Sequence, residues 1–195
     1  MVKKTSKVFM SVFIIAAMVF TLGSCGSPSE ESRTEDQILT IATYTDGSDC
    51  IMDPQMTWSY GDWQYNNQLY DTLVTADFDG QTIKDALAES WEVSDNGMIY
   101  TFHLKEGVKF HSGKEFTSED VKWTYERWKT NPETAYSYYL DYVDSIECPD
   151  DRTVVINLTQ NDNNLLINLT SPVASIMNGD AVAQAEADGQ VYGVE

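Results

Sequence analysis

Between residues 88 and 128 the chain alternates apolar and polar positions, and the period changes once, from two residues to a helical repeat. Alternation over 91–94 and 99–104, on either side of an Asn-Gly pair, predicts a two-stranded hairpin. Residues 108–110 are expected to resume extended structure. Thr117, with Asp120 three residues later, predicts a capped helix start. The pattern places these residues on shared faces: Tyr100, Phe102 and Leu104 on the second strand, and Val121, Thr124, Tyr125 and Trp128 on the core-facing stripe of the helix.

Weaker patterns predict the remaining elements. A first strand is expected at Ile38–Tyr44, and a helix at 58–72 with apolar side chains at helical spacing, at Tyr65, Leu69 and Tyr70. The tyrosine-rich stretch 135–142 is expected to be helix or loop. A second hairpin and two short helices are expected at 143–148 with 153–158, at 164–169 and at 181–187.

Several short motifs in this region resemble the signature of the family 5 extracellular solute-binding proteins, the receptors of bacterial ABC importers for oligopeptides, dipeptides and nickel. The order and spacing of the motifs make the resemblance specific, although most of their residues belong to turns, caps and the core. The matching pieces are Met52-Asp53-Pro54, 67–74, 87–91, Tyr100-Thr101-Phe102, 107–111 and 116–121.

The resemblance implies an α/β fold of the periplasmic binding protein-like class II, of which this chain carries the first lobe only. That lobe is expected to be a mixed sheet with β-hairpins and flanking helices, and to be incomplete. Family members are typically longer, with two lobes around a ligand cleft. Residues 38–195 are therefore expected to form the truncated N-terminal lobe of a family 5 domain.

The N-terminus reads as an export signal. Three lysines precede an apolar run over 8–22, which is shorter than the roughly 20 residues that a spanning helix needs. Leu22-Gly23-Ser24-Cys25 resembles a bacterial lipobox, which implies a lipoprotein signal peptide over 1–24 and lipid attachment at Cys25. The alternatives are an uncleaved anchor, or an ordinary signal with a chance cysteine. The polar, acidic stretch within 25–37 predicts a flexible tether.

The net charge and the cysteines limit which classes of function the protein can have. The formal net charge is −19, and cleavage before Cys25 would remove three lysines and take it to −22. Such a chain repels phosphate, so nucleic-acid binding is disfavoured. Cys50 and Cys148 are interpreted as unpaired, buried thiols, with a disulfide as the alternative.

No catalytic motif stands out. The chain lacks GxSxG, HExxH and a glycine-rich phosphate loop, so an enzyme is the least favoured class and no cofactor or metal is expected. Its two histidines, His103 and His111, lie eight residues apart. A structural hydrogen-bonding role is favoured for His111 over a metal site.

The functional residues are therefore expected to bind a ligand. The resemblance places the cleft edge at the loop after the first strand and around the helix that begins near Trp58, and an extended peptide would pair there with main chain. The candidate ligand-binding residues are Tyr44, Thr45, Asp46, Tyr60 and Trp63. The alternative is structural, with Tyr44 ending a core strand and Trp63 packing its helix.

The resulting hypothesis is a lipid-anchored, extracytoplasmic receptor that captures oligopeptides and delivers them to an ABC permease. A monomer is expected, with a small peptide ligand, permease subunits and the membrane, through its lipid anchor, as partners. The alternatives are a nickel-chelate or sugar receptor of the same family, and a non-transport surface lipoprotein left by a truncated gene.

Overall fold

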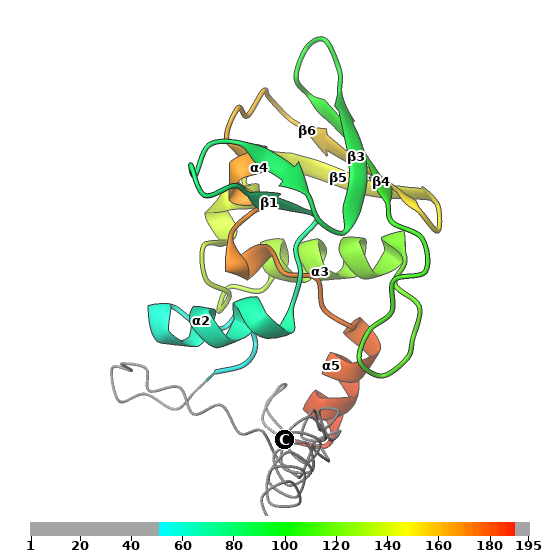
Figure 1. Ribbon diagram of the computed structural model, residues 1–195. Coiled ribbons are helices and arrows are strands. Elements are labelled where there is room, and N and C mark those ends of the chain that lie inside the picture. Colours follow the sequence, from blue (N-terminus) through cyan, green and yellow to red (C-terminus); the bar gives the residue numbers. More distant parts are fainter. Residues whose placement is uncertain (1–50, 190–195) are drawn as a thin grey trace, which may run out of the picture. The chain divides into compact units, whose positions relative to one another are not determined.

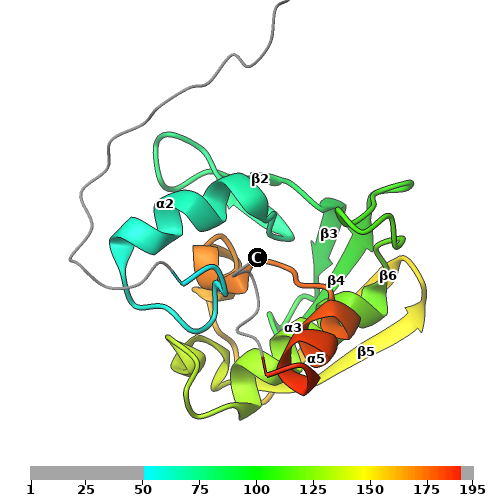
Figure 2. The same cartoon turned by 90° about the horizontal axis from the view of Figure 1, so that it is seen from below.

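The computed structural model describes residues 51–189 of the chain. They form a four-stranded sheet of order β3-β4-β6-β5 and a separate two-stranded sheet, β1-β2, with helix α3 packed against the larger sheet (Figure 1). Figure 2 shows α5 alongside α3. The elements are α2 (Tyr60–Leu69), β1 (Val74–Ala76), β2 (Ile83–Asp85), β3 (Ala88–Val93), β4 (Ile99–Leu104), α3 (Ser118–Thr130), η1 (Ser137–Leu140), β5 (Val143–Asp150), β6 (Thr153–Leu158), α4 (Leu165–Asn168), η2 (Pro172–Ala174) and α5 (Gly179–Ala187).

The hairpin predicted around the Asn-Gly pair is present. Strands β3 and β4 pair antiparallel, with Trp91 opposite Phe102, and Gly97 takes a φ of +67° in the turn. The turn needs glycine for this conformation; a Cβ there would lie 2.6 Å from the side-chain nitrogen of Asn161, an exposed side chain that can move aside.

One face of the large sheet and one stripe of α3 form the core. Inward-facing residues of β4 and β6 alternate with half-buried or exposed ones, as a sheet with one solvated face requires. The stripe of α3 predicted from spacing, Val121, Thr124, Tyr125 and Trp128, is fully buried, which confirms that it faces the core. The central core residues are Phe102, Leu104, Val121, Tyr125, Trp128, Val154, Ile156 and Leu158.

The start of α3 is held as the capping motif predicts. The Asp120 carboxylate accepts hydrogen bonds from the backbone N–H of Thr117 at 3.0 Å and from its hydroxyl at 3.1 Å. The Ser118 hydroxyl donates to the carbonyl of Asp150 at 2.6 Å, which joins the helix start to the β5–β6 turn. Local sequence therefore sets the start of the helix, and a contact between residues 32 positions apart sets its place against the sheet.

Several predictions need correction. Residues 108–110 form no strand; Lys109 makes a single bridge to Glu115. Strand β2 was not anticipated. The stretch 135–142, expected to be helix or loop, contains the 3₁₀ helix η1, which agrees with the prediction. Helix α2 is present but runs over Tyr60–Leu69 rather than 58–72. Leu69, one of the apolar residues at helical spacing, is 43% exposed, and the buried residues of α2 are Gly61, Asp62 and Asn66.

The α/β class is confirmed, and every strand pairing between the named strands is antiparallel. The expected first strand at 38–44, the signal peptide at 1–24, Cys25 and the tether lie outside the described residues. None of the helices within 51–189 combines the length and apolar character needed to cross a membrane.

Replacing Tyr125 by phenylalanine is expected to stabilise the fold by about 1 kcal/mol. The Tyr125 hydroxyl is fully buried and has no hydrogen-bond partner in the described part of the chain, and an unsatisfied buried polar group is destabilising. Urea unfolding would measure the change. Tyr100→Phe is the matched control, because that hydroxyl donates to the Asp162 carbonyl at 3.2 Å. Equal destabilisation of the two variants would contradict the prediction.

Candidate ligand-binding surface

Helix α2 is attached to the molecule through polar side chains. The Thr57 hydroxyl donates to the buried Asp62 carboxylate at 2.6 Å and accepts the Ser59 N–H at 3.0 Å. Asp62 lies in the first turn of α2, where a negative charge is favourable. Because polar groups occupy the inner side of the helix, Tyr60 is exposed and Trp63 and Tyr65 are only half-buried.

The segment before α2 is held by a buried ion pair. Asp53 and Arg127 meet at 2.7 Å between Oδ2 and Nη2 and at 3.4 Å between Oδ1 and Nη1, and their side chains are only 3% and 12% exposed. This two-point contact matches the planar guanidinium to the carboxylate. Asp53 in the Met52-Asp53-Pro54 motif is therefore a structural residue that ties the start of the described chain to α3.

Gln55 extends this attachment to a second segment. Its side chain accepts from Arg127 at 2.7 Å and donates to the Thr124 carbonyl at 2.9 Å. Its own carbonyl accepts the Ala135 N–H at 2.7 Å. The chain before α2 is thus bonded both to α3 and to the stretch that leads into Tyr136.

These attachments bring together an aromatic cluster, which consists of Trp58, Trp63, Tyr136, Tyr138 and Tyr139. Tyr136 lies at its centre: its ring centroid is 4.7 Å from that of Trp58 and 5.5 Å from that of Trp63. The Tyr138 and Tyr139 rings lie 5.9 and 5.4 Å from Tyr136 and are 4.9 Å apart. The tilted arrangements are those that aromatic quadrupoles favour.

The backbone of Tyr136 is strained. Its φ of 55° and ψ of 29° are left-handed, and it is the only described residue other than glycine with a positive φ. This conformation costs roughly 1–2 kcal/mol for a residue with a side chain. Such strain persists where surrounding contacts hold it and is concentrated at functional sites. Here the Ala135–Gln55 hydrogen bond and the neighbouring aromatic rings hold it.

The cluster presents aromatic faces to solvent. Trp58 is 61% exposed and Tyr138 57% exposed, while Tyr136 and Tyr139 are half-buried beneath them. Burial raises the pKa of Tyr139, and the adjacent Tyr138 adds to the effect, so its hydroxyl remains a neutral donor. The Trp63 indole N–H is buried without a hydrogen-bond partner among residues 51–189. A surface of this kind can stack on planar or apolar groups of a ligand and on cations.

The structure describes two of the five predicted ligand-binding residues, and these two differ in exposure. Tyr60 is 74% exposed, at the start of α2, whereas Trp63 is half-buried and packs on Tyr136. Tyr44, Thr45 and Asp46 lie outside the described residues, so their roles stay predictions. Sequence reasoning did not select Trp58, Tyr136, Tyr138 or Tyr139 as site residues. The run of tyrosines at 136–142 was the available signal.

Two other candidate chemistries find no support within the described chain. No group of three or more His, Cys, Asp or Glu side chains there could hold a metal ion. His111 is exposed and makes no side-chain hydrogen bond to another described residue, so the expected structural role is not seen.

Cys148 is a free thiol, but it is half-buried rather than buried. Its thiol donates to the Ser118 carbonyl, and burial raises the pKa of this thiol. Cys50 lies outside the described residues.

Comparison with known proteins identifies relatives along most of the described chain. Di/tripeptide-binding protein 1 of Pseudomonas aeruginosa (strain UCBPP-PA14) is 35% identical over 140 residues, which cover 63% of this chain and 26% of that protein. Heme-binding protein A of Haemophilus influenzae is also 35% identical, over 133 residues that cover 59% of this chain and 24% of that protein.

A solved structure adds a comparison of folds. The ABC transporter-associated periplasmic binding protein DppA from Helicobacter pylori, in complex with the peptide STSA, is 29% identical, with a TM-score of 0.63. The match covers 75% of this chain and 32% of that one. The chain therefore spans between 24% and 32% of the length of these three relatives.

A family model described as "Bacterial extracellular solute-binding proteins, family 5 Middle" matches residues 82–192. This range includes β3, β4, α3 and the second hairpin, the elements that form the core. The chain belongs to the family 5 bacterial extracellular solute-binding proteins, a family of extracytoplasmic binding proteins.

Proposed function

We propose that this chain is the peptide-capturing part of a lipid-anchored receptor that delivers oligopeptides to an ABC permease. The observation that carries the proposal is membership of family 5 together with relatives named for di- and tripeptide binding. The exposed aromatic cluster beside α2 supports it, because such a surface accepts varied side chains without a fixed hydrogen-bond code.

In the proposed mode of binding, the receptor contacts the main chain and the side chains of the peptide at different places. An extended peptide pairs with the main chain of the loop at Tyr44–Asp46, which holds any sequence equally. Tyr60 and the aromatic cluster then contact its side chains, with bridging water where the fit is loose. Binding favours a closed form over an open one by its difference in affinity for the two, and the closed form engages the permease.

Isothermal calorimetry of the purified chain with a mixed library of di- to pentapeptides is expected to give heat of binding. Because the chain spans only part of the length of its relatives, its affinity is expected to be lower than that of a receptor with two complete lobes. Free amino acids and acetylated, amidated peptides are the matched controls. Absence of heat with every peptide, from protein whose circular dichroism shows a folded state, would contradict the proposal.

A second candidate ligand is a metal chelate or porphyrin. Heme-binding protein A is as similar in sequence to this chain as the di/tripeptide-binding protein is. The exposed faces of Trp58 and Tyr138 in the aromatic cluster also suit a large planar ligand. Titration with hemin, followed by its Soret absorbance and by quenching of tryptophan fluorescence, distinguishes the two. Saturable binding of hemin without heat from any peptide would favour this candidate.

Cys25→Ser is expected to abolish lipid labelling and to release the chain from the membrane fraction. The expectation rests on the resemblance of Leu22-Gly23-Ser24-Cys25 to a lipobox, in which the cysteine is acylated and becomes the first mature residue. The measurement is incorporation of an alkyne-palmitate in a bacterial host, compared with Cys148→Ser as the control. Equal labelling of the Cys25→Ser and unmodified chains would show that Cys25 carries no lipid.

A further inference from the structure

The segments that carry the aromatic cluster contain no basic residue. Neither 56–71 nor 131–142 includes a lysine, an arginine or a histidine. The basic residues that precede the second segment are both engaged elsewhere: Arg127 binds the Asp53 carboxylate, and Lys129 donates to a main-chain carbonyl of β5. The cluster is therefore rich in electrons and has no positive charge in its own segments.

Contacts between a cation and an aromatic ring occur at other places in the described chain. Lys114 and Arg127 each lie 5.9 Å from the centre of an aromatic ring, and neither ring belongs to the cluster. Within 51–189 no such contact is made to the rings of the cluster. A ring face attracts a cation through its quadrupole. The faces of Trp58 and Tyr138, which are 61% and 57% exposed, are thus open to a cation from a ligand.

Negative charge lies next to the cluster along the chain. Asp141 is exposed, and its N–H donates to the Tyr138 carbonyl at 3.3 Å. Glu133 is also exposed and comes three residues before Tyr136. The formal net charge of −19 attracts cations to the chain as a whole. Ring electrostatics and charge therefore favour the same kind of ligand group.

The shape of the cluster favours one cation over others. The ring centroids of Trp58 and Tyr138 lie 4.7 and 5.9 Å from that of Tyr136, so the two exposed faces belong to one patch. A guanidinium is planar, stacks on aromatic faces and is more weakly hydrated than an ammonium. It therefore gains more from an aromatic surface, and loses less hydration there, than the side chain of lysine does.

We propose that the aromatic cluster is the subsite for an arginine side chain of the bound peptide, with the guanidinium stacked on the exposed face of Trp58 or Tyr138. The inference rests on the proposed function, because it names the peptide side chain that this part of the site prefers. Lysine binds there more weakly, and a neutral side chain of the same shape more weakly still.

Calorimetry of the whole chain with matched tripeptides tests this. Three peptides carry arginine at the first, second or third position and alanine elsewhere, and each has a twin with citrulline in place of arginine. Citrulline keeps the length and the planar end group but has no charge. At one position at least, the arginine peptide is expected to bind about 2–5-fold more tightly than its twin, the range typical of an exposed cation–π contact.

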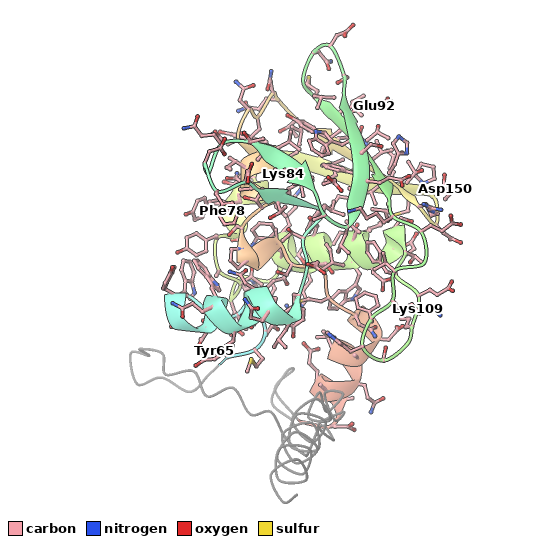
Figure 3. All side chains as sticks on the ribbon, viewed as in Figure 1. Tyr65, Phe78, Lys84, Glu92, Lys109 and Asp150 are labelled. Carbon is pink, nitrogen blue, oxygen red and sulfur yellow. The ribbon has the colours of Figure 1, made fainter. Side chains whose placement is uncertain are left out.

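Substitutions show whether the ring faces cause the preference. Trp58→Leu combined with Tyr138→Leu is expected to bring the ratio of the two affinities to about one. Both side chains are largely exposed, so the variant is expected to fold, which circular dichroism would check. Phe78→Leu is the matched control: Phe78, labelled in Figure 3, is fully exposed in the β1–β2 turn, and its loss should leave the ratio unchanged. All these variants have the same net charge.

The outcomes separate this inference from the proposed function. Peptide binding without a preference for arginine at any position would overturn the inference and leave the proposed function standing. Absence of binding by every peptide would overturn both. A preference that survives in the double variant, or that disappears in Phe78→Leu, would show that the faces of Trp58 and Tyr138 are not its source, and would also overturn the inference.

Discussion

Arg127→Ala is expected to lower the free energy of unfolding by about 3–5 kcal/mol, because it leaves the Asp53 carboxylate buried without its counter-charge. Gln55 loses a hydrogen bond at the same time. The urea midpoint, followed by circular dichroism, would measure the loss. Such a change is a large fraction of the stability of an ordinary domain.

A double-mutant cycle with Asp53→Ala distinguishes the loss of the ion pair from other destabilising effects of removing the Arg127 side chain. The double variant is expected to be no less stable than Arg127→Ala alone, since both charges are then gone. Lys105→Ala is the matched control: its Nζ meets Asp85 at 2.8 Å on an exposed surface, and no shift of the midpoint is expected. Additive losses at Asp53 and Arg127 would show that the pair is not coupled.

Tyr136→Ala is expected to weaken peptide binding at least about 30-fold. Removing the central ring takes away the support of Trp58 and Tyr138 at once, and truncating a central aromatic anchor of an interface typically costs 2 kcal/mol or more. Calorimetric titration with the tightest peptide from the library would measure it. This prediction rests on the proposed function. If the unmodified chain binds no peptide, the same comparison of Tyr136→Ala with the unmodified chain is made by titration with hemin.

Tyr136→Gly separates the ring from the backbone. Glycine adopts the left-handed conformation without strain, so this variant is expected to unfold at higher urea than Tyr136→Ala while binding ligand equally weakly. If Tyr136→Gly instead restored binding, the contribution of Tyr136 would come from its backbone. Unchanged affinity in both variants would remove the aromatic cluster from the ligand site.

The parts of the fold that sequence predicts well are those with local signals. The Asn-Gly turn, the alternation in β4 and the Thr117–Asp120 cap each depend on residues a few positions apart, and all are present. Pairing of the hairpin at 143–158 also follows from short-range pattern. Local agreement of this kind is typical of sequences that specify one structure.

The parts that were missed depend on distant polar partners. Helix α2 buries Asp62 and Asn66, so the apolar spacing along it points to the wrong face. Its position comes from Asp53 and Gln55, which bond to α3 about 70 residues later in the chain. Hydrophobic periodicity carries no information about such contacts.

The aromatic cluster was missed for a similar reason. Trp58 and Trp63 meet Tyr136 because the Ala135 N–H bonds the Gln55 carbonyl and Tyr136 is left-handed. Neither feature has a sequence signature, since glycine and asparagine are the usual residues in that conformation. The tyrosine run indicated that aromatic side chains gather there, but not what they meet.

The Asp53–Arg127 contact also bears on the order in which the molecule is assembled and opened. It joins positions 74 residues apart, whereas the hairpins and the α3 cap close over short loops. Long loops close at a greater entropic cost, so α2 and the Trp58 side of the cluster are expected to join a sheet and helix that are already formed. The contact between α3 and the segment before α2 is also expected to be among the first to open when the native state fluctuates. The aromatic cluster would then have a local mobility that the core lacks.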